Sequence, residues 1–321
     1  MRTYPSFSGA QGIPLRCFTQ PLREGRFQRA PKRDTAGRTI PSAWDRVRAR
    51  PEPHAESAGS PGARVDTREF MEFRPLDASG SQAANSAYYD AFSKGYEQAR
   101  GKNAPRGYHE LLDTLEAELV ARYGAGKDVL EVGCGTGLVL ERLSRFAASA
   151  TGIDVSPGML EVARSRGLTV ELGSATELPF ADERFDVACS FKVLAHVPDL
   201  TLALREMARV TRPGGFILAE LYNPNSFRGA LKRFGPKLAI ARGVNEGDVF
   251  TRYHSPAQGR ALTPEGCRFV TARGIRIVTP VGALMLVPGL RDALWSAEHA
   301  LCDSWMSRFG GFWVAVFQKL G

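Results

Sequence analysis

Apolar residues follow two different spacings along residues 83–320. Apolar positions three or four residues apart predict helices, and short runs of near-continuous apolar residues predict strands. Apolar strands that alternate with helices are typical of a parallel sheet covered on both faces. The pattern predicts helices over 86–100, 107–124, 137–147, 156–167, 200–211, 263–274 and 289–305, and strands over 128–134, 150–155, 169–175, 185–191, 214–221, 275–282 and 312–320.

Capping residues support several of these boundaries. Gly124 stands where a helix over 107–124 would end. Ser156 followed by Pro157 is a helix start, because serine caps a helix and proline fits its first position. Thr263 followed by Pro264 predicts the same for 263–274.

Residues 1–70 differ from the rest of the chain. Prolines recur between arginines, serines and glycines, and the apolar residues keep neither spacing. Such a segment buries too little surface to offset its ordering entropy, so we expect a disordered, basic, Pro-rich extension. It is interpreted as a spacer or as residues translated from an early start before Met71; a targeting peptide and a basic arm are the alternatives.

Charge and cysteine content narrow the function classes. Most of the surplus behind the net charge of +8 lies in the first 80 residues, so the remainder is close to neutral and no nucleic-acid partner is expected. No stretch is apolar for long enough to span a bilayer. Five scattered cysteines, none in a CxxC pair, favour a reducing cytoplasm without disulfides or a metal site.

The segment VLEVGCGTG, residues 129–137, carries the clearest chemistry. A strand that enters a glycine-rich turn before a helix is a device for binding a nucleotide cofactor, since glycines let a ligand approach the backbone. Asp154 follows about 20 residues later, at the end of the next strand, where an acid binds ribose hydroxyls.

Two details argue against a dinucleotide. Leu138 stands where a dinucleotide-binding fingerprint has its third glycine. Glu131 precedes the glycines, and its carboxylate would repel a pyrophosphate but attract an α-amino group. The ligand of this loop is therefore expected to carry a cation.

Five motifs in register resemble class I S-adenosylmethionine-dependent methyltransferases, in the small-molecule branch that includes ubiquinone and menaquinone biosynthesis enzymes. They are VLEVGCGTG, GIDVSPGMLEVAR, GSATELPFADERFDVACS and EMARVTRPGGFILAE, of which the third spans two motifs. The resemblance covers roughly residues 85–222. It implies an α/β, Rossmann-like, doubly wound and mostly parallel seven-stranded sheet with a final antiparallel strand. The methyltransferase domain would occupy 71–321, with a cofactor-binding core at 107–222, an insert or lid at 223–262 and completion of the sheet by 263–321.

The resemblance also assigns site residues. Glu131 would face the cofactor's amino group, Asp154 both ribose hydroxyls, and Val155 and Met159 the adenine. Ser174 departs from the family pattern, which often has Asp there. The full cofactor set is Glu131, Gly133, Cys134, Gly135, Gly137, Asp154, Val155, Met159, Ser174, Ala175 and Phe191.

Methyl transfer needs a general base only when the acceptor is a weak nucleophile. His196, just after the fourth strand, is the candidate base. The alternative for His196 is a structural role before a helix capped by Asp199. Lys192 is a second candidate catalytic residue at the cleft. Tyr88, Tyr89 and Tyr96 resemble the aromatic N-terminal helix that covers the cofactor in this branch. Phe234 lies in a basic, partly periodic stretch, 226–242, that would cover the acceptor or meet a membrane.

The predicted function is S-adenosylmethionine-dependent methyl transfer to a small, lipophilic acceptor by in-line displacement. Two alternatives stay open: a macromolecular acceptor, and a binding protein with a nucleic-acid-contacting tail. The (D/N)PP(F/Y) motif of amino-methylating nucleic-acid enzymes is absent after the fourth strand, where ACSFKV stands instead.

Overall fold

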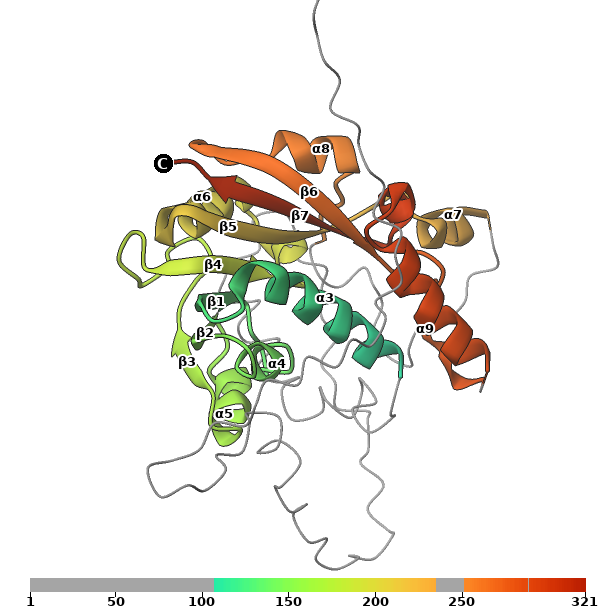
Figure 1. Cartoon of the computed structure of the whole chain (residues 1–321), viewed down its shortest axis with the longest axis horizontal. Helices are drawn as coiled ribbons and strands as arrows, with labels where there is room; N and C mark the ends of the chain where they lie inside the picture. The colour runs from blue at the N-terminus through green and yellow to red at the C-terminus, as the bar shows by residue number, and fades with distance from the viewer. Residues whose placement is uncertain (1–106, 235–250, 288) are drawn as a thin grey trace, which may run out of the picture. The chain divides into compact units, whose positions relative to one another are not determined.

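The computed structural model describes residues 107–234, 251–287 and 289–321, with side chains for all of these except 231–234. Seven strands form one sheet in the order β3-β2-β1-β4-β5-β7-β6 (Figure 1). Neighbouring strands are parallel from β3 to β5, while β7 is antiparallel to both β5 and β6. The predicted fold class, a mostly parallel sheet with a final antiparallel strand, is confirmed. The strands are β1 (Asp128–Val132), β2 (Ser149–Asp154), β3 (Thr169–Leu172), β4 (Phe185–Ser190), β5 (Thr211–Tyr222), β6 (Cys267–Ile275) and β7 (Phe312–Lys319).

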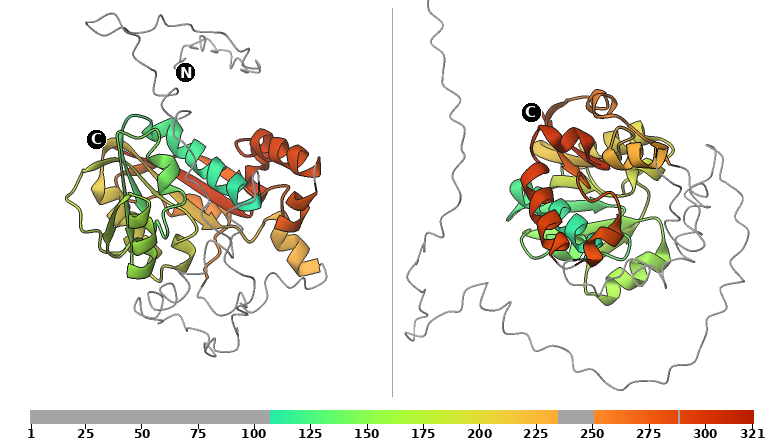
Figure 2. Two further views of the ribbon diagram at one scale, coloured as in Figure 1. Left: turned by 90° about the horizontal axis from the view of Figure 1, so that it is seen from below. Right: turned by 90° about the vertical axis from the view of Figure 1, so that its right-hand side faces the viewer.

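Helices cover both faces of this sheet (Figures 1 and 2). On one face α3 and α9 pack over Val129, Val187 and Val314, with α4 and α5 beside them around Leu140 and Leu160. The other face packs against α6 and α8. The helices are α3 (Tyr108–Gly124), α4 (Leu140–Leu143), α5 (Pro157–Ser165), α6 (Leu200–Val210), α7 (Phe227–Phe234), α8 (Pro256–Ala261) and α9 (Leu290–Leu301), with short 3₁₀ turns η2 (Leu194–His196), η3 (Gly282–Leu286) and η4 (Trp305–Phe309).

Two of the sequence-level helix starts are confirmed. The Ser156 hydroxyl accepts from the Met159 N–H (3.2 Å) at the start of α5, and Pro157 takes its first position. The Asp199 carboxylate accepts from the Leu202 N–H (2.9 Å) and caps α6. Both caps aim the N-terminus of a helix toward the carboxyl edge of the sheet, where parallel α/β folds bind ligands.

The predicted helix over 263–274 is wrong, because β6 occupies Cys267–Ile275. Thr263 does not cap a helix; its hydroxyl donates to the Arg260 carbonyl (2.7 Å) at the end of α8. Gly266 then turns the chain with a φ of +70°. β7 provides the backbone partners that make the next residues a strand, which is a long-range contact that local spacing does not encode.

The predicted strand over 275–282 is also wrong beyond Ile275. Arg276 has a φ of +63°, and the N–H groups of the next three residues, 277–279, donate to the buried Glu298 carboxylate of α9. Their backbone is satisfied by a side chain instead of a neighbouring strand. The helix predicted over 137–147 is shorter than expected, with only Leu140–Leu143 α-helical and no side-chain cap.

The predicted lid, 223–262, lies partly outside the described residues. Its last part contains α8, where a Cβ at Gly259 would stand 2.6 Å from the Trp313 ring, so this helix packs on the sheet. Its first part contains α7, Phe227–Phe234. In the described parts of the chain, no helix combines the length and the apolar character that a membrane crossing requires.

Candidate active site

A cavity of about 390 Å³ opens at the carboxyl ends of β1, β2 and β4. Parallel strands end together at this edge, so the loops that follow them share one site. The cavity brings together ten of the eleven predicted cofactor residues and both predicted catalytic residues. Its lining contains Glu131, Gly133, Cys134, Gly135, Asp154, Val155, Met159, Ser174, Ala175, Phe191, Lys192 and His196.

The glycine loop forms one wall of the cavity. Gly133 and Gly135 have φ values of +78° and +53°, a region that favours glycine. A Cβ at Gly133 would stand 2.3 Å from the Val193 side chain, so the loop needs glycine for space as well as for conformation. Gly137 is the predicted residue that lies outside the lining; a Cβ there would stand 2.3 Å from Leu168, which assigns it to packing beside α5.

Asp154 ends β2 with both carboxylate oxygens oriented. One oxygen accepts from the Gly135 N–H (2.9 Å) and the other from the Ser156 N–H (3.0 Å). These bonds tie the glycine loop to the start of α5. Each oxygen keeps further acceptor capacity, so the carboxylate can also receive hydroxyl groups from a ligand in the cavity.

Glu131 reaches the cavity from inside the sheet. Its side chain is 3% exposed, and its buried Oε2 has no hydrogen-bond partner among the described residues. Burial raises the pKa of this carboxyl well above its ordinary value, and the neighbouring Glu116 raises it further. A buried acceptor without a partner is costly, so the site is suited to a ligand that brings a cationic donor.

Lys192 lines the cavity, but carboxylates from α3 hold its ammonium group. Its Nζ lies 2.9 Å from Asp113 Oδ1 and 2.7 Å from Glu116 Oε2. Its backbone N–H donates to Glu220 Oε1 (3.0 Å), and its φ is +60°. These contacts favour a role in positioning over proton transfer.

The three acids around Lys192 were not predicted as site residues. The sequence carried a weak signal for them: Asp113 and Glu116 interrupt the apolar face of a helix at a spacing of three, and Glu220 interrupts an apolar strand. All three side chains are buried. Buried acids in an amphipathic pattern indicate a partner that the pattern itself cannot name.

His196 lies in η2 at the mouth of the same cavity. Its Nε2 is 3.4 Å from the Tyr222 hydroxyl and its Nδ1 is 3.4 Å from the Thr251 hydroxyl. The Tyr222 ring meets the imidazole edge-on, with centroids 5.5 Å apart. The imidazole is thus held between two hydroxyl groups beside the glycine loop.

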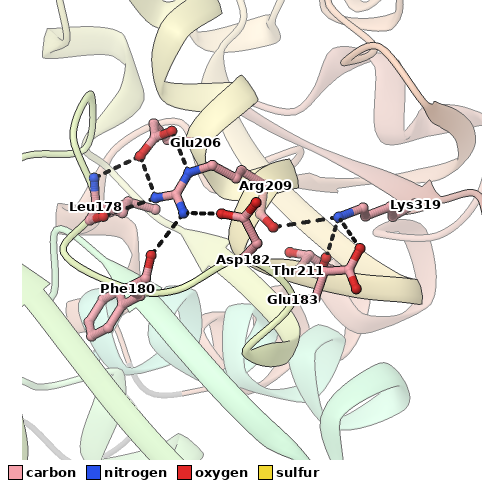
Figure 3. Close-up of polar contacts among 8 residues, drawn as sticks. All are labelled: Leu178, Phe180, Asp182, Glu183, Glu206, Arg209, Thr211 and Lys319. Carbon is pink, nitrogen blue, oxygen red and sulfur yellow. Dashed lines mark hydrogen bonds and ion pairs between the residues drawn. The ribbon is translucent and has the colours of Figure 1, made fainter.

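Ser174 and Ala175 lie in the loop between β3 and β4, and side chains of α6 hold this loop by hydrogen bonds. Arg209 donates from its guanidinium to the carbonyls of Leu178 and Phe180, and it pairs with Glu206 and Asp182 (Figure 3). Within the loop, the Ser174 and Thr176 hydroxyls are 2.8 Å apart. The loop therefore presents a fixed polar edge to the cavity.

The remaining predicted residues are not tested by this geometry. Tyr88, Tyr89 and Tyr96 lie outside the described residues, as does the extension 1–70. Phe234 is the last residue of α7, and its side chain is not described. Sequence reasoning also missed some other lining residues: Thr136 lies inside the first motif, and Val193 and Leu202 lie between the later motifs.

The chain is similar to known methyltransferases. Residues 130–219 match a family model described as a methyltransferase domain. A ubiquinone biosynthesis O-methyltransferase from Azorhizobium caulinodans is 32% identical over 186 residues, which is 51% of this chain and 73% of that protein. A demethylmenaquinone methyltransferase from Mycobacterium marinum is 38% identical over 131 residues, covering 39% of this chain and 57% of that protein.

Solved structures share the fold. A SAM-dependent methyltransferase from Thermotoga maritima, described as a possible histamine N-methyltransferase, aligns with a TM-score of 0.53 and 22% identity over 73% of this chain and 99% of its own. The [4+2]-cyclase SpnF aligns with a TM-score of 0.50 and 22% identity over 74% of this chain and 97% of its own. Because one fold carries different chemistries, these two likenesses concern architecture alone. The family model, the first relative and the motif residues gathered around one cavity identify the chain as a member of the class I S-adenosylmethionine-dependent methyltransferases.

Proposed function

We propose that this methyltransferase transfers a methyl group to a small, lipophilic acceptor by in-line displacement. The observation that carries the proposal is one cavity that joins the glycine loop, Asp154 and His196. S-adenosylmethionine, when bound, supplies an electrophilic methyl group on a sulfonium whose leaving group is neutral. The protein's main task is then alignment of the acceptor with that methyl group in a site shielded from water.

The cavity residues divide the cofactor's recognition between them. Glu131 is proposed to receive the α-amino group, because its Oε2 is buried without a partner. Asp154 is proposed to accept from the ribose hydroxyls, since two backbone N–H groups already orient its oxygens. Val155, Met159 and Ala175 supply apolar contact for the adenine, and the Ser174 hydroxyl supplies a polar contact at its edge. Burial raises the pKa of the Cys134 thiol, so this residue contributes a neutral wall.

His196 is proposed as the general base for a hydroxyl acceptor. It lines the cavity with one nitrogen facing the Tyr222 hydroxyl and the other facing the Thr251 hydroxyl. A neutral imidazole in that position can take a proton from a phenol or hydroquinol as the new bond forms. Lys192 is proposed to position this region, because its ammonium is held by two carboxylates.

The proposed acceptor class rests on the relatives and on the lining. Both named relatives belong by name to quinone biosynthesis, and the cavity wall includes apolar side chains from Leu138, Val193 and Leu202. Together these observations favour a phenolic or quinol-type small molecule over a macromolecule.

A cover over the acceptor is proposed for 223–255, together with the aromatic stretch around Tyr88–Tyr96. Phe227 is 43% exposed and stacks on Phe309 with centroids 5.0 Å apart, so α7 begins with an apolar side chain at the surface. Lys232, Lys237 and Phe234 continue the basic, apolar stretch 226–242, for which we propose peripheral contact with a membrane. Their triple alanine variant should raise the acceptor KM without changing cofactor affinity, and liposome co-sedimentation should fall with it.

Localisation is proposed to be cytoplasmic. Four cysteines, Cys134, Cys189, Cys267 and Cys302, are unpaired in the described part of the chain, as a reducing compartment would keep them.

The test combines binding with transfer. Titration calorimetry with S-adenosylmethionine should show binding, and labelled cofactor with phenols, quinols and hydroxy acids should reveal the acceptor. His196→Ala should lower kcat by about 10²–10⁴-fold on a hydroxyl acceptor while cofactor affinity stays unchanged. His299→Ala, which removes a histidine on α9 outside the cavity lining, is the matched control. Absence of cofactor binding would overturn the proposed function, and an unchanged kcat in His196→Ala would overturn the base.

A further inference from the structure

Four buried carboxyl groups gather on the α3 side of the sheet. Side chains alternate between the faces of a strand, so Glu131 lies on the same face as Val129, which packs under α3. Glu220 likewise shares the face of Leu218, which belongs to the same cluster. From above, α3 adds Asp113 and Glu116, three residues apart. Each of the four residues is at most 5% exposed.

Among the described residues, Lys192 is the cation that forms ion pairs with this group. Lys192 Nζ pairs with Asp113 and Glu116 at 2.9 and 2.7 Å, and its backbone N–H donates to Glu220. Within the described residues, no ion pair reaches Glu131. The cluster therefore holds more carboxyl groups than one ammonium can neutralise.

Several ionised carboxylates in a buried site repel one another, and burial penalises each charge further. Burial raises the pKa of Glu131 and of Glu220 well above the ordinary value, and proximity to Glu116 adds to both shifts. A proton retained in the cluster would lower this cost. Glu131 is the member that borders the cavity.

We propose that cofactor binding expels this proton: the Glu131 O–H bond breaks, the proton leaves to solvent, and the remaining carboxylate pairs with the ligand's α-ammonium group. This inference rests on the proposed function of Glu131. In it, Lys192, Glu116 and Glu220 are positioning residues that keep acidic groups in excess around Glu131, so that the cofactor supplies a cation.

The charged groups that face Glu131 come from every element packed around it. They are Asp113 and Glu116 of α3, Asp154 at the end of β2, and Lys192 after β4, with Glu220 of β5 on the same face of the sheet. Acids outnumber the single lysine, so their combined effect on a cation in the cavity is attraction. Loss of one proton on binding makes affinity rise with pH by up to about tenfold per unit.

Calorimetry in two buffers of different ionisation enthalpy measures the released proton directly. S-adenosylhomocysteine keeps the α-amino group, whereas methylthioadenosine lacks it, so the first should release close to one proton and the second none. The titrations belong between about pH 5.5 and 7, because the α-amino group itself loses a proton near pH 7.7–8.0.

Glu131→Gln mimics the protonated acid and should fold. It should bind S-adenosylhomocysteine without proton release, with an affinity close to the parent's at the acid end and lower by about tenfold or more at the neutral end. The control, Glu118→Gln, changes a carboxyl of α3, the helix that carries Asp113 and Glu116. The Glu118 side chain is 48% exposed, and proton release in this variant should equal the parent's.

The outcomes separate the two proposals. Binding of S-adenosylhomocysteine without proton release, or equal release with both ligands, overturns the inference and leaves the proposed function standing. Failure of the parent protein to bind either ligand overturns both. Unchanged proton release in Glu131→Gln would assign the proton to another group and overturn the role of Glu131.

Discussion

Two groups of charged side chains differ in how completely their carboxylates are paired. We call them the Arg209 network, formed by Arg209 with Glu206 and Asp182, and the Glu131 cluster, the four buried acids Asp113, Glu116, Glu131 and Glu220. In the first, one arginine of α6 donates from Nε, Nη1 and Nη2 to two carboxylates and two backbone carbonyls (Figure 3). Lys319 of β7 extends it by donating to the Thr211 carbonyl (2.8 Å). In the second, Lys192 contacts three of the four buried carboxyl groups, and within the described residues Glu131 Oε2 has no hydrogen-bond partner.

The pKa values of Glu206 and Glu131 shift in opposite directions. The hydrogen bond from Arg209 lowers the pKa of the Glu206 carboxyl, whereas burial raises the pKa of Glu131. A carboxylate whose partners are complete favours its charge, and one that lacks a cation avoids it. The difference supports the proposals that the Arg209 network stabilises the fold and that the Glu131 cluster binds a ligand.

The largest expected effect is on the cofactor side of this comparison. Asp154→Ala should weaken S-adenosylmethionine binding by roughly 2–4 kcal/mol, because two charge-assisted hydrogen bonds to the ribose disappear. Asp154→Asn keeps one acceptor and should lose less. Calorimetric titration of both variants measures this, and parent-like affinity in both would show that Asp154 does not bind the ribose.

Removal of the Arg209 side chain should instead lower the free energy of unfolding. Arg209→Ala removes the guanidinium donor from the Leu178 and Phe180 carbonyls, and it leaves Glu206 with the Leu178 N–H as a donor. We expect a loss of roughly 1–3 kcal/mol, moderated by the partial exposure of the Arg209 side chain. Urea unfolding monitored by circular dichroism gives the value. Arg209→Lys is the control, since a single ammonium cannot reproduce the fork and should recover only part of the loss. A stability equal to the parent's would place the network outside the fold's stabilising contacts.

The response of stability to pH should separate the two groups. Glu206 has a lowered pKa in the folded state, so its contribution is present above the unfolded value and is lost as the pH falls through the folded one. Glu131 and Glu220 have raised pKa values, so the folded state binds more protons and stability falls as the pH rises above the ordinary carboxyl range. Each proton contributes at most about 1.4 kcal/mol per pH unit.

Unfolding free energies measured across this range should show both slopes. Glu206→Gln should reduce the change of unfolding free energy with pH below the ordinary carboxyl range. Glu131→Gln should reduce the change of unfolding free energy with pH above that range. The gain in Tm from S-adenosylhomocysteine should grow as the pH rises toward neutral. A gain that is constant with pH would contradict the electrostatic difference between the two groups.

The smallest expected effect is that of the extension. Removal of residues 1–70 should leave both the melting temperature and the cofactor affinity unchanged, because its composition predicts no packed structure. Thermal unfolding and calorimetry of 71–321 against the full chain test this. A clear fall in either quantity would mean that residues 1–70 contribute to the folded domain.

The sequence by itself determined what local patterns encode. The Ser156 cap and the turns at Gly133 and Gly135 follow from backbone preferences of neighbouring residues. Apolar strands that alternate with helices indicated the parallel sheet, and five motifs in register supplied the order of the elements. The ten predicted residues that line the cavity could be grouped because they lie in or next to those motifs, and parallel strands end at the same edge of the sheet.

Only the tertiary structure decided the features that depend on distant partners. β6 is a strand because β7 lies beside it, and residues 277–279 leave the sheet because Glu298 of α9 accepts their N–H groups. Lys192 pairs with Asp113 only because α3 packs on the sheet and brings the two residues together. Hydrogen bonds and charge pairs of this kind join groups far apart in the chain, and local spacing carries no record of which distant group will complete them.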